Sequence, residues 1–160
     1  MLRNVLAGAF AGALGTVALN VATYVDMAIR GRPPSSATSQ LISTLADKAG
    51  ISLSPQGVDS DDQTAQNRES GLGALLGYVN GLGVDAVYGL LRSQFGNVSL
   101  PLAGVGIGLA AMAASDIPLV TLKVSDPKTW GFSGWAADLI PHVIYGLVTV
   151  TAYEVMRNTD

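Results

Sequence analysis

The segment from Pro101 to Leu122 constrains the fold of this chain more than any other. It contains a single charged side chain, Asp116, among residues that are otherwise apolar or small. About 20 residues at 1.5 Å each cross the hydrocarbon core of a bilayer as a helix, so a run of this length predicts a membrane span. Because a carboxylate inside a span is costly, we expect Asp116 to find a partner, a proton or water. Pro118 follows two residues later and frees the carbonyl group of Ala114 from its helical hydrogen bond.

The composition agrees with a protein built from such spans. Of the 160 residues, 49% are hydrophobic and only 13% are charged, against about 25% charged in an average soluble domain. The net charge of −3 and the lack of a basic stripe give no sign of a nucleic-acid partner. The absence of cysteine excludes disulfides and cysteine nucleophiles. With one histidine, no ligand-spaced cluster and no nucleophile motif, the sequence predicts no metal, no cofactor and no enzymatic activity.

Three further apolar segments repeat the pattern, and the four together predict an all-α integral membrane bundle in a single transmembrane domain. The first segment is interpreted as a retained span, because its apolar run from Asn4 to Val25 is too long for a signal-peptide core. A short helix from Gln40 to Ala49, stopped by Gly50, is expected at the membrane interface within the first loop. Polar residues without periodicity predict a mobile acidic loop over residues 51–70. The predicted spans cover residues 5–29, 71–91, 101–122 and 134–156.

Small residues recur every four positions in three of the spans, and each series reaches a polar residue twelve positions after its first glycine. Small side chains at this spacing let helix backbones approach closely. Two interpretations stay open, namely simple helix packing and an ancestral repeat with functional polar ends. The three polar ends are Asn20, Asp85 and Asp116. The glycines expected to pack against other helices are Gly8, Gly12, Gly73, Gly77, Gly81, Gly104 and Gly108.

Polar groups inside the predicted spans form a second pattern. Asp116 and Asp138 each precede an intramembrane proline, and proline-interrupted spans at matching places point to transporter binding sites. Asp138 and His142 are four residues apart and so share one helix face. Asp85 belongs nearer the opposite membrane face, which would separate it from the others. The candidate buried polar residues are Asn20, Asp26, Asp85, Asp116, Asp138 and His142.

Structural interpretations of the same residues stay open. An acid at the position of Asp138 is also favoured by the dipole at a helix N-terminus. His142 is equally explained as a hydrogen-bond partner of a neighbouring helix, and Asp26 as a headgroup-level partner of Arg30. Basic residues are more numerous on the side of the two loops, so the positive-inside rule favours loops inside and both termini outside.

The segment His142-Val-Ile-Tyr145-Gly146, followed by a run that ends in Tyr153-Glu154-Val155, resembles the YagU-like inner-membrane proteins. A glycine-rich first span that ends in Arg-Gly-Arg-Pro-Pro, residues 30–34, resembles them as well. This resemblance implies a multi-pass protein of the bacterial cytoplasmic membrane and implies no particular activity. The motif positions that it singles out are Arg32, His142, Tyr145 and Gly146, and Arg30 is expected beside Arg32 on the loop face.

Two functions follow as hypotheses. In the first, a buried polar site of Asp116, Asp138 and His142 handles protons or a small solute. In the second, the protein is an accessory or scaffold subunit whose glycine-rich helix faces dock onto a larger membrane complex. The expected partners are the lipid bilayer and either further copies of the chain or other membrane subunits.

Overall fold

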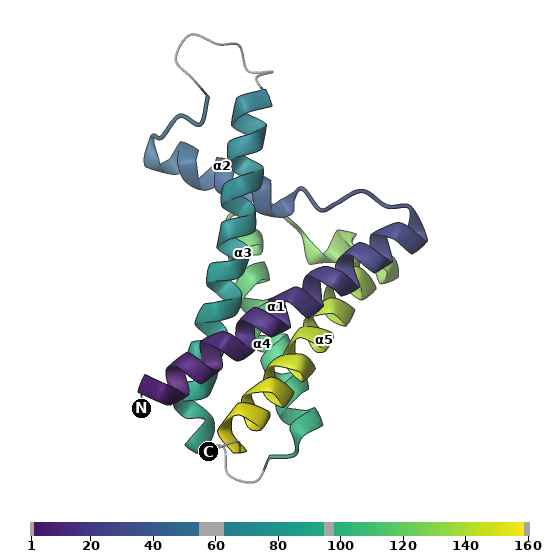
Figure 1. The fold of residues 1–160 in the computed structure, drawn as a ribbon. Coiled ribbons are helices and arrows are strands. Elements are labelled where there is room, and N and C mark those ends of the chain that lie inside the picture. The colour runs from purple at the N-terminus through teal and green to yellow at the C-terminus, as the bar shows by residue number, and fades with distance from the viewer. Residues whose placement is uncertain (1, 55–62, 95–97, 159–160) are drawn as a thin grey trace.

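The computed structural model describes residues 2–54, 63–94 and 98–158, which are helical apart from short connections (Figure 1). Four of its helices are long and apolar enough to cross a membrane, and this part of the predicted fold is confirmed. These four are α1 (Leu2–Arg30), α3 (Gln63–Leu91), α4 (Leu100–Thr121) and α5 (Gly131–Asn158). The shorter α2 (Ala37–Ala49) and two single 3-10 turns, Arg92–Gln94 and Pro127–Thr129, complete the helical elements of the described residues.

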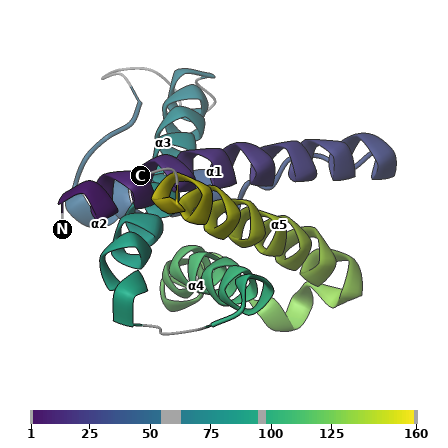
Figure 2. The ribbon, with the colours of Figure 1, turned by 60° about the horizontal axis from the view of Figure 1, so that its bottom comes forward.

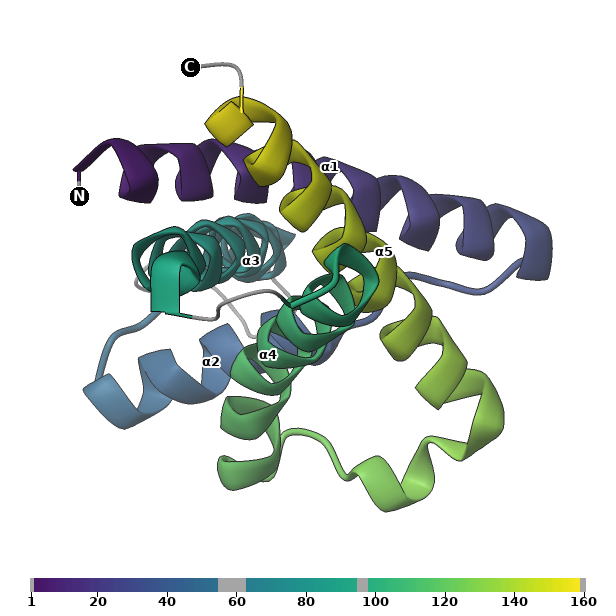
Figure 3. The ribbon, with the colours of Figure 1, turned by 90° about the horizontal axis from the view of Figure 1, so that it is seen from below.

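The helix α5 lies at the centre of the bundle. It runs between α1 and α4 and packs along both of them, while α3 packs against α1 (Figures 2 and 3). The helix α2 lies across α3, where Thr38 packs at Gly73. We call the end with both chain termini the terminal side. The opposite end, with the end of α1 and the start of α5, is the loop side.

The structure moves two predicted boundaries. The helix α3 begins at Gln63, so its first turns occupy part of the segment predicted as a mobile loop. A helix that projects beyond an apolar layer needs no apolar face. The lack of hydrophobic periodicity therefore did not exclude a helix in this segment. Arg68 also donates a hydrogen bond to the Leu53 carbonyl oxygen at 2.7 Å. Residues 55–62 of that loop lie outside the described residues. The short helix begins at Ala37, earlier than predicted, and ends at Gly50 as predicted, with a left-handed φ of 68°.

Glycines bring the helices close to backbone contact. A Cβ atom on Gly8 would lie 2.2 Å from the carbonyl oxygen of Asp85, and one on Gly89 would lie 2.2 Å from that of Asn4. No side chain fits at such distances unless α1 and α3 move apart. The predicted packing glycines that lie against another helix are Gly8, Gly12, Gly73, Gly81, Gly104 and Gly108.

The prediction for Gly77 is wrong within this chain. The residue is exposed, and no atom lies within 4 Å of a Cβ built on it. The reason is the way in which α3 is covered. Thr38 of α2 contacts it at Gly73 and Thr16 of α1 contacts it at Gly81, and Gly77 falls between these two levels.

Candidate functional site

Three of the predicted polar residues come together between α4 and α5, and we call Asp116, Asp138 and His142 the loop-side cluster. The side chain of Asp116 lies within hydrogen-bond reach of Asp138 and within the electrostatic field of His142. The Nδ1 atom of His142 lies 3.1 Å from Oδ1 of Asp138 and 2.8 Å from its backbone oxygen. The candidate acids of two different spans therefore share one site with the single histidine of the chain.

Close packing of α4 on α5 positions this cluster. A Cβ atom on Gly146 would lie 2.0 Å from the carbonyl oxygen of Gly104, and one on Gly108 would lie 2.4 Å from that of His142. The two helices run in opposite directions, so a step along α4 toward Asp116 is a step along α5 toward its start. The packing explains why position 146 is a glycine, because any side chain there would separate the two helices that carry the acids.

The contacts within the loop-side cluster limit where two of its protons can lie. Carboxylates only accept hydrogen bonds, so a hydrogen bond between Asp116 and Asp138 requires a proton on one of them. Oδ2 of Asp138 is buried and has no donor among the described residues, which leaves room for such a proton. Both contacts of Nδ1 in His142 are acceptors, so Nδ1 carries a hydrogen. Nε2 is therefore the nitrogen that can gain or lose a second proton.

Two other predicted residues do not join the loop-side cluster. Asp26 accepts hydrogen bonds through Oδ2 from Arg30 at 2.7 Å and from Arg32 at 2.5 Å, at the end of α1. Arg30 also donates to the carbonyl oxygen of Ser133 at 3.3 Å, which ties the end of α1 to the start of α5. Asn20 is half-buried and forms no hydrogen bond with any residue that the structure describes.

The remaining acid, Asp85, lies in a separate site toward the terminal side. Its accessible surface is 0%. Its Oδ2 atom lies within hydrogen-bond distance of the hydroxyl of Tyr145 and 3.4 Å from Oγ1 of Thr149. The Tyr145 hydroxyl also lies 2.9 Å from the carbonyl oxygen of Gly81. Gly12 of α1 closes the site, because a Cβ there would lie 2.3 Å from Oδ2. We call Asp85, Tyr145 and Thr149 the Asp85 site.

Sequence reasoning selected Asp85 but missed its partners, since Tyr145 entered only as a motif position and Thr149 not at all. A signal was present in the spacing. Two helices that run in the same direction can pair residues at a constant offset, and three of the hydrogen bonds between α5 and α3 share an offset of 64 residues, whereas the one between Tyr145 and Asp85 does not. The paired series are Tyr145, Thr149 and Tyr153 on α5 and Gly81, Asp85 and Gly89 on α3.

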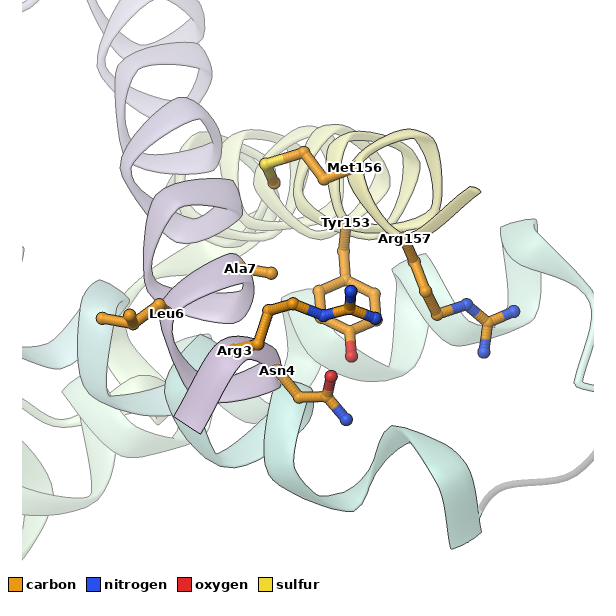
Figure 4. A pocket seen from close by; sticks show the side chains of 7 residues that line it. All are labelled: Arg3, Asn4, Leu6, Ala7, Tyr153, Met156 and Arg157. Atoms are coloured by element: carbon orange, nitrogen blue, oxygen red, sulfur yellow. The ribbon is translucent and has the colours of Figure 1, made fainter. Parts of the chain in front are cut away.

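The terminal side ends in a pocket of about 230 Å³ between the start of α1 and the end of α5 (Figure 4). Nearby, Glu154 accepts from Nε of Arg92 at 2.6 Å and from Nη2 of Arg157 at 2.9 Å. Burial opposes the charge of Arg92, but the hydrogen bond and the charge of Glu154, together with the nearby Tyr88, outweigh burial and raise the pKa of Arg92. The pocket walls include Arg3, Asn4, Leu6, Tyr153, Met156 and Arg157.

Comparisons with protein-family models, with curated proteins and with solved structures find no match to this chain. Within the described residues, no group of three or more His, Cys, Asp or Glu side chains gathers as metal ligands. The two acidic sites are therefore the features of the described residues that bear on function.

Proposed function

We propose that this is a multi-pass protein of the bacterial cytoplasmic membrane whose loop-side cluster binds and releases protons, alone or together with a small solute. The observation that carries the proposal is the contact between Asp116, Asp138 and His142. It occurs within two helices that are long and apolar enough to cross a membrane. The resemblance to the YagU-like proteins supports this choice of membrane. Ionisable groups within membrane spans mark substrate, ion or proton pathways.

Charge balance supports reversible proton binding. With one proton shared by the two carboxyl groups and a neutral imidazole, the loop-side cluster carries one negative charge. A second proton on Nε2 of His142 makes the cluster neutral overall. A net charge in apolar surroundings is costly, which favours uptake of that proton, while the adjacent carboxylate keeps the imidazolium paired. The cluster can therefore exchange one proton without bringing two unpaired like charges together.

Access from the loop side supports the same function. The side chain of Asp138 is 25% exposed and that of His142 is 13% exposed. The Asp26 carboxylate and its two arginines lie at the same end of the bundle, where Arg30 contacts Ser133 at the start of α5. If this exposed surface meets water, protons and small polar solutes have a route to the loop-side cluster that does not pass the buried Asp85.

A flux assay tests the proposal. Purified protein is reconstituted into liposomes that contain a pH-sensitive dye, and a potassium gradient with valinomycin drives proton entry. We expect wild-type flux and a loss of about 100-fold in Asp116→Asn, the size typical of removing a positioned proton-transfer group. Circular dichroism checks that the variant retains its helix content.

The matched control is Asp47→Asn, which neutralises an exposed carboxylate on α2 outside the cluster and should leave the flux unchanged. Flux without any added solute would show that protons pass alone. Flux that needs an added solute would show coupled transport. The proposal is wrong if Asp116→Asn conducts like the wild type, or if wild-type liposomes show no flux with any of the solutes tried.

One observation favours the second hypothesis, a scaffold subunit. Gly77 of α3 and Gly106 of α4 have no atom within 4 Å of an added Cβ, so both present open glycine faces. Such faces suit docking of a further helix. Gentle affinity purification from native membranes would recover a foreign subunit in stoichiometric amount, and Gly77→Leu would release it. Recovery of the chain alone would remove the support for this function.

A further inference from the structure

The Asp85 site buries an acid in an unusual way. Asp85 has no accessible surface, and its Oδ1 atom is buried without a hydrogen-bond partner among the described residues. From α1 it faces Gly8 and Gly12, and from α5 it faces Tyr145 and Thr149. Of these neighbours only Tyr145 is titratable. No Lys, Arg or His of the described residues contacts Asp85, so its charge has no counter-ion.

The hydrogen bonds of the Tyr145 hydroxyl indicate the protonation state of Asp85. The phenol has one hydrogen but two close oxygens, the Gly81 carbonyl at 2.9 Å and Oδ2 of Asp85. If Asp85 is a carboxylate, only one of the two contacts can be a hydrogen bond. If Oδ2 carries a proton, Asp85 donates to the phenol oxygen and the phenol donates to Gly81, so both contacts are satisfied. The geometry therefore fits a neutral, protonated Asp85.

The position of Tyr145 on α5 suggests how the proton on Asp85 could be exchanged. Asp138, His142, Tyr145 and Thr149 are separated by four, three and four residues, so they share one face of the helix. Tyr145 lies one turn beyond His142, roughly 4.5 Å along the axis. The Asp85 site therefore lies between the loop-side cluster and the terminal pocket that Tyr153 lines (Figure 4).

We propose that Asp85 is a second proton-binding site in series with the loop-side cluster, and that the Tyr145 hydroxyl passes the proton to and from it. This inference rests on the proposed function. In the transfer, the O–H bond of Asp85 breaks and its proton moves to the phenol oxygen. The phenol's own proton moves through one water molecule to the imidazole of His142. Asp85 becomes a carboxylate, His142 an imidazolium and Tyr145 stays neutral; the return step reverses each transfer.

Two tyrosine variants separate proton transfer from packing. Tyr145 and Tyr153 are both 1% exposed, and both hydroxyls donate to a glycine carbonyl of α3. Each replacement by Phe removes a hydrogen bond to a glycine carbonyl, and Tyr145→Phe also removes the contact with Asp85, so the helix content of both variants is compared by circular dichroism. Only Tyr145 contacts an acid, and water in the terminal pocket can take the place of the Tyr153 hydroxyl. We expect proton flux to fall about 100-fold in Tyr145→Phe and to stay near the wild-type value in Tyr153→Phe.

Infrared spectroscopy provides a readout that does not need transport. In lipid nanodiscs at neutral pH, we expect a carbonyl stretching band of a protonated carboxyl group that disappears in Asp85→Asn and shifts in Tyr145→Phe. The Asn side chain keeps the shape of Asp85 and can still donate to the phenol oxygen, so the fold is retained. Absence of this band overturns the inference, whether or not the wild-type protein conducts protons.

Two further outcomes decide the role of the site. If the band is present but Asp85→Asn and Tyr145→Phe both conduct like the wild type, Asp85 is a structural acid and the proposed series is wrong. If Asp116→Asn abolishes flux while these two variants do not, the loop-side cluster stands alone. Loss of flux in Asp116→Asn, Asp85→Asn and Tyr145→Phe, with Tyr153→Phe unchanged, supports the two sites in series.

Discussion

The loop-side and terminal-side halves of the bundle both contain acids within apolar helices, but they treat them differently. On the loop side, Asp138 keeps 25% of its side-chain surface and has an imidazole beside it. On the terminal side, Asp85 keeps none and has a phenol and a hydroxyl as partners. The same residue type is thus accessible and charge-paired in one half, and sealed without a counter-ion in the other.

Helix packing explains the difference. Three glycines of α1 face the Asp85 site, namely Gly8, Gly12 and Gly15. A side chain at any of them would collide with α3 or α5. Backbones at this distance exclude water, so the acid between them can be stabilised only by hydrogen bonds and a proton. Toward the loop side α1 separates from α3 (Figure 1), and there the acids have arginine or histidine partners. In this bundle the acid between closely packed helices is therefore the one without a charged partner.

The largest contrast should appear in chemical labelling. The chain has no cysteine, so single cysteines can be introduced without a background signal. Thr149→Cys lies in the Asp85 site at a position with 0% exposure, whereas Ser133→Cys lies at the exposed start of α5. With a water-soluble maleimide, we expect complete labelling at Ser133 and none at Thr149 in the same time, because the thiolate must be reached by the reagent. Equal labelling of the two would show that the terminal half is not sealed.

The next largest effect concerns the glycines that form the seal. Gly12→Ala places a methyl group 2.3 Å from Oδ2 of Asp85, and overpacking of this kind costs about 2–3 kcal/mol. Reversible unfolding in mixed detergent micelles measures this loss. The control is Gly77→Ala, which meets open space and should be neutral or gain up to about 1 kcal/mol from helix propensity. A stable Gly12→Ala protein would mean that α1 and α3 are farther apart than the structure places them.

Much of this architecture was predictable, because apolar length and four-residue spacing are properties of single segments. The four candidate spans, the stop at Gly50 and the meeting of Asp116 with Asp138 and His142 all follow from span length and direction. An acid late in one span and an acid early in the next must lie at the same end of a helical hairpin. No long-range information is needed for that step.

The Asp85 site was less predictable, because its contacts depend on which helices become neighbours. Tyr145 reaches α3 only because α1 and its glycines draw α3 and α5 together. Sequence patterns locate a stripe on each helix but do not select the stripe that it will face. The open position of Gly77 has the same origin, since its environment depends on where α1 and α2 cross α3.

A smaller effect is expected where the terminal side meets solvent. Glu154 accepts from Arg92 and Arg157, and the side chains of Arg92 and Glu154 are only 13% and 16% exposed. Glu154→Gln leaves two guanidinium groups without their shared carboxylate, and we expect a loss of about 2 kcal/mol, within the range for a hydrogen bond to a charged group. Unfolding at low and high salt checks this value, and an unchanged stability would show that water already screens the pair.

The smallest effect is expected for the corresponding ion pairs on the loop side. Asp26 pairs with Arg30 and Arg32, but all three side chains keep between 23% and 31% of their surface. Exposed pairs contribute little because water and salt screen them. In the same unfolding assay, Asp26→Asn should therefore be barely distinguishable from the wild type. A loss as large as that of Glu154→Gln would show that the loop side is closed as tightly as the terminal side. In that case, exposure would no longer explain why the loop-side acids are paired with cations while Asp85 is not.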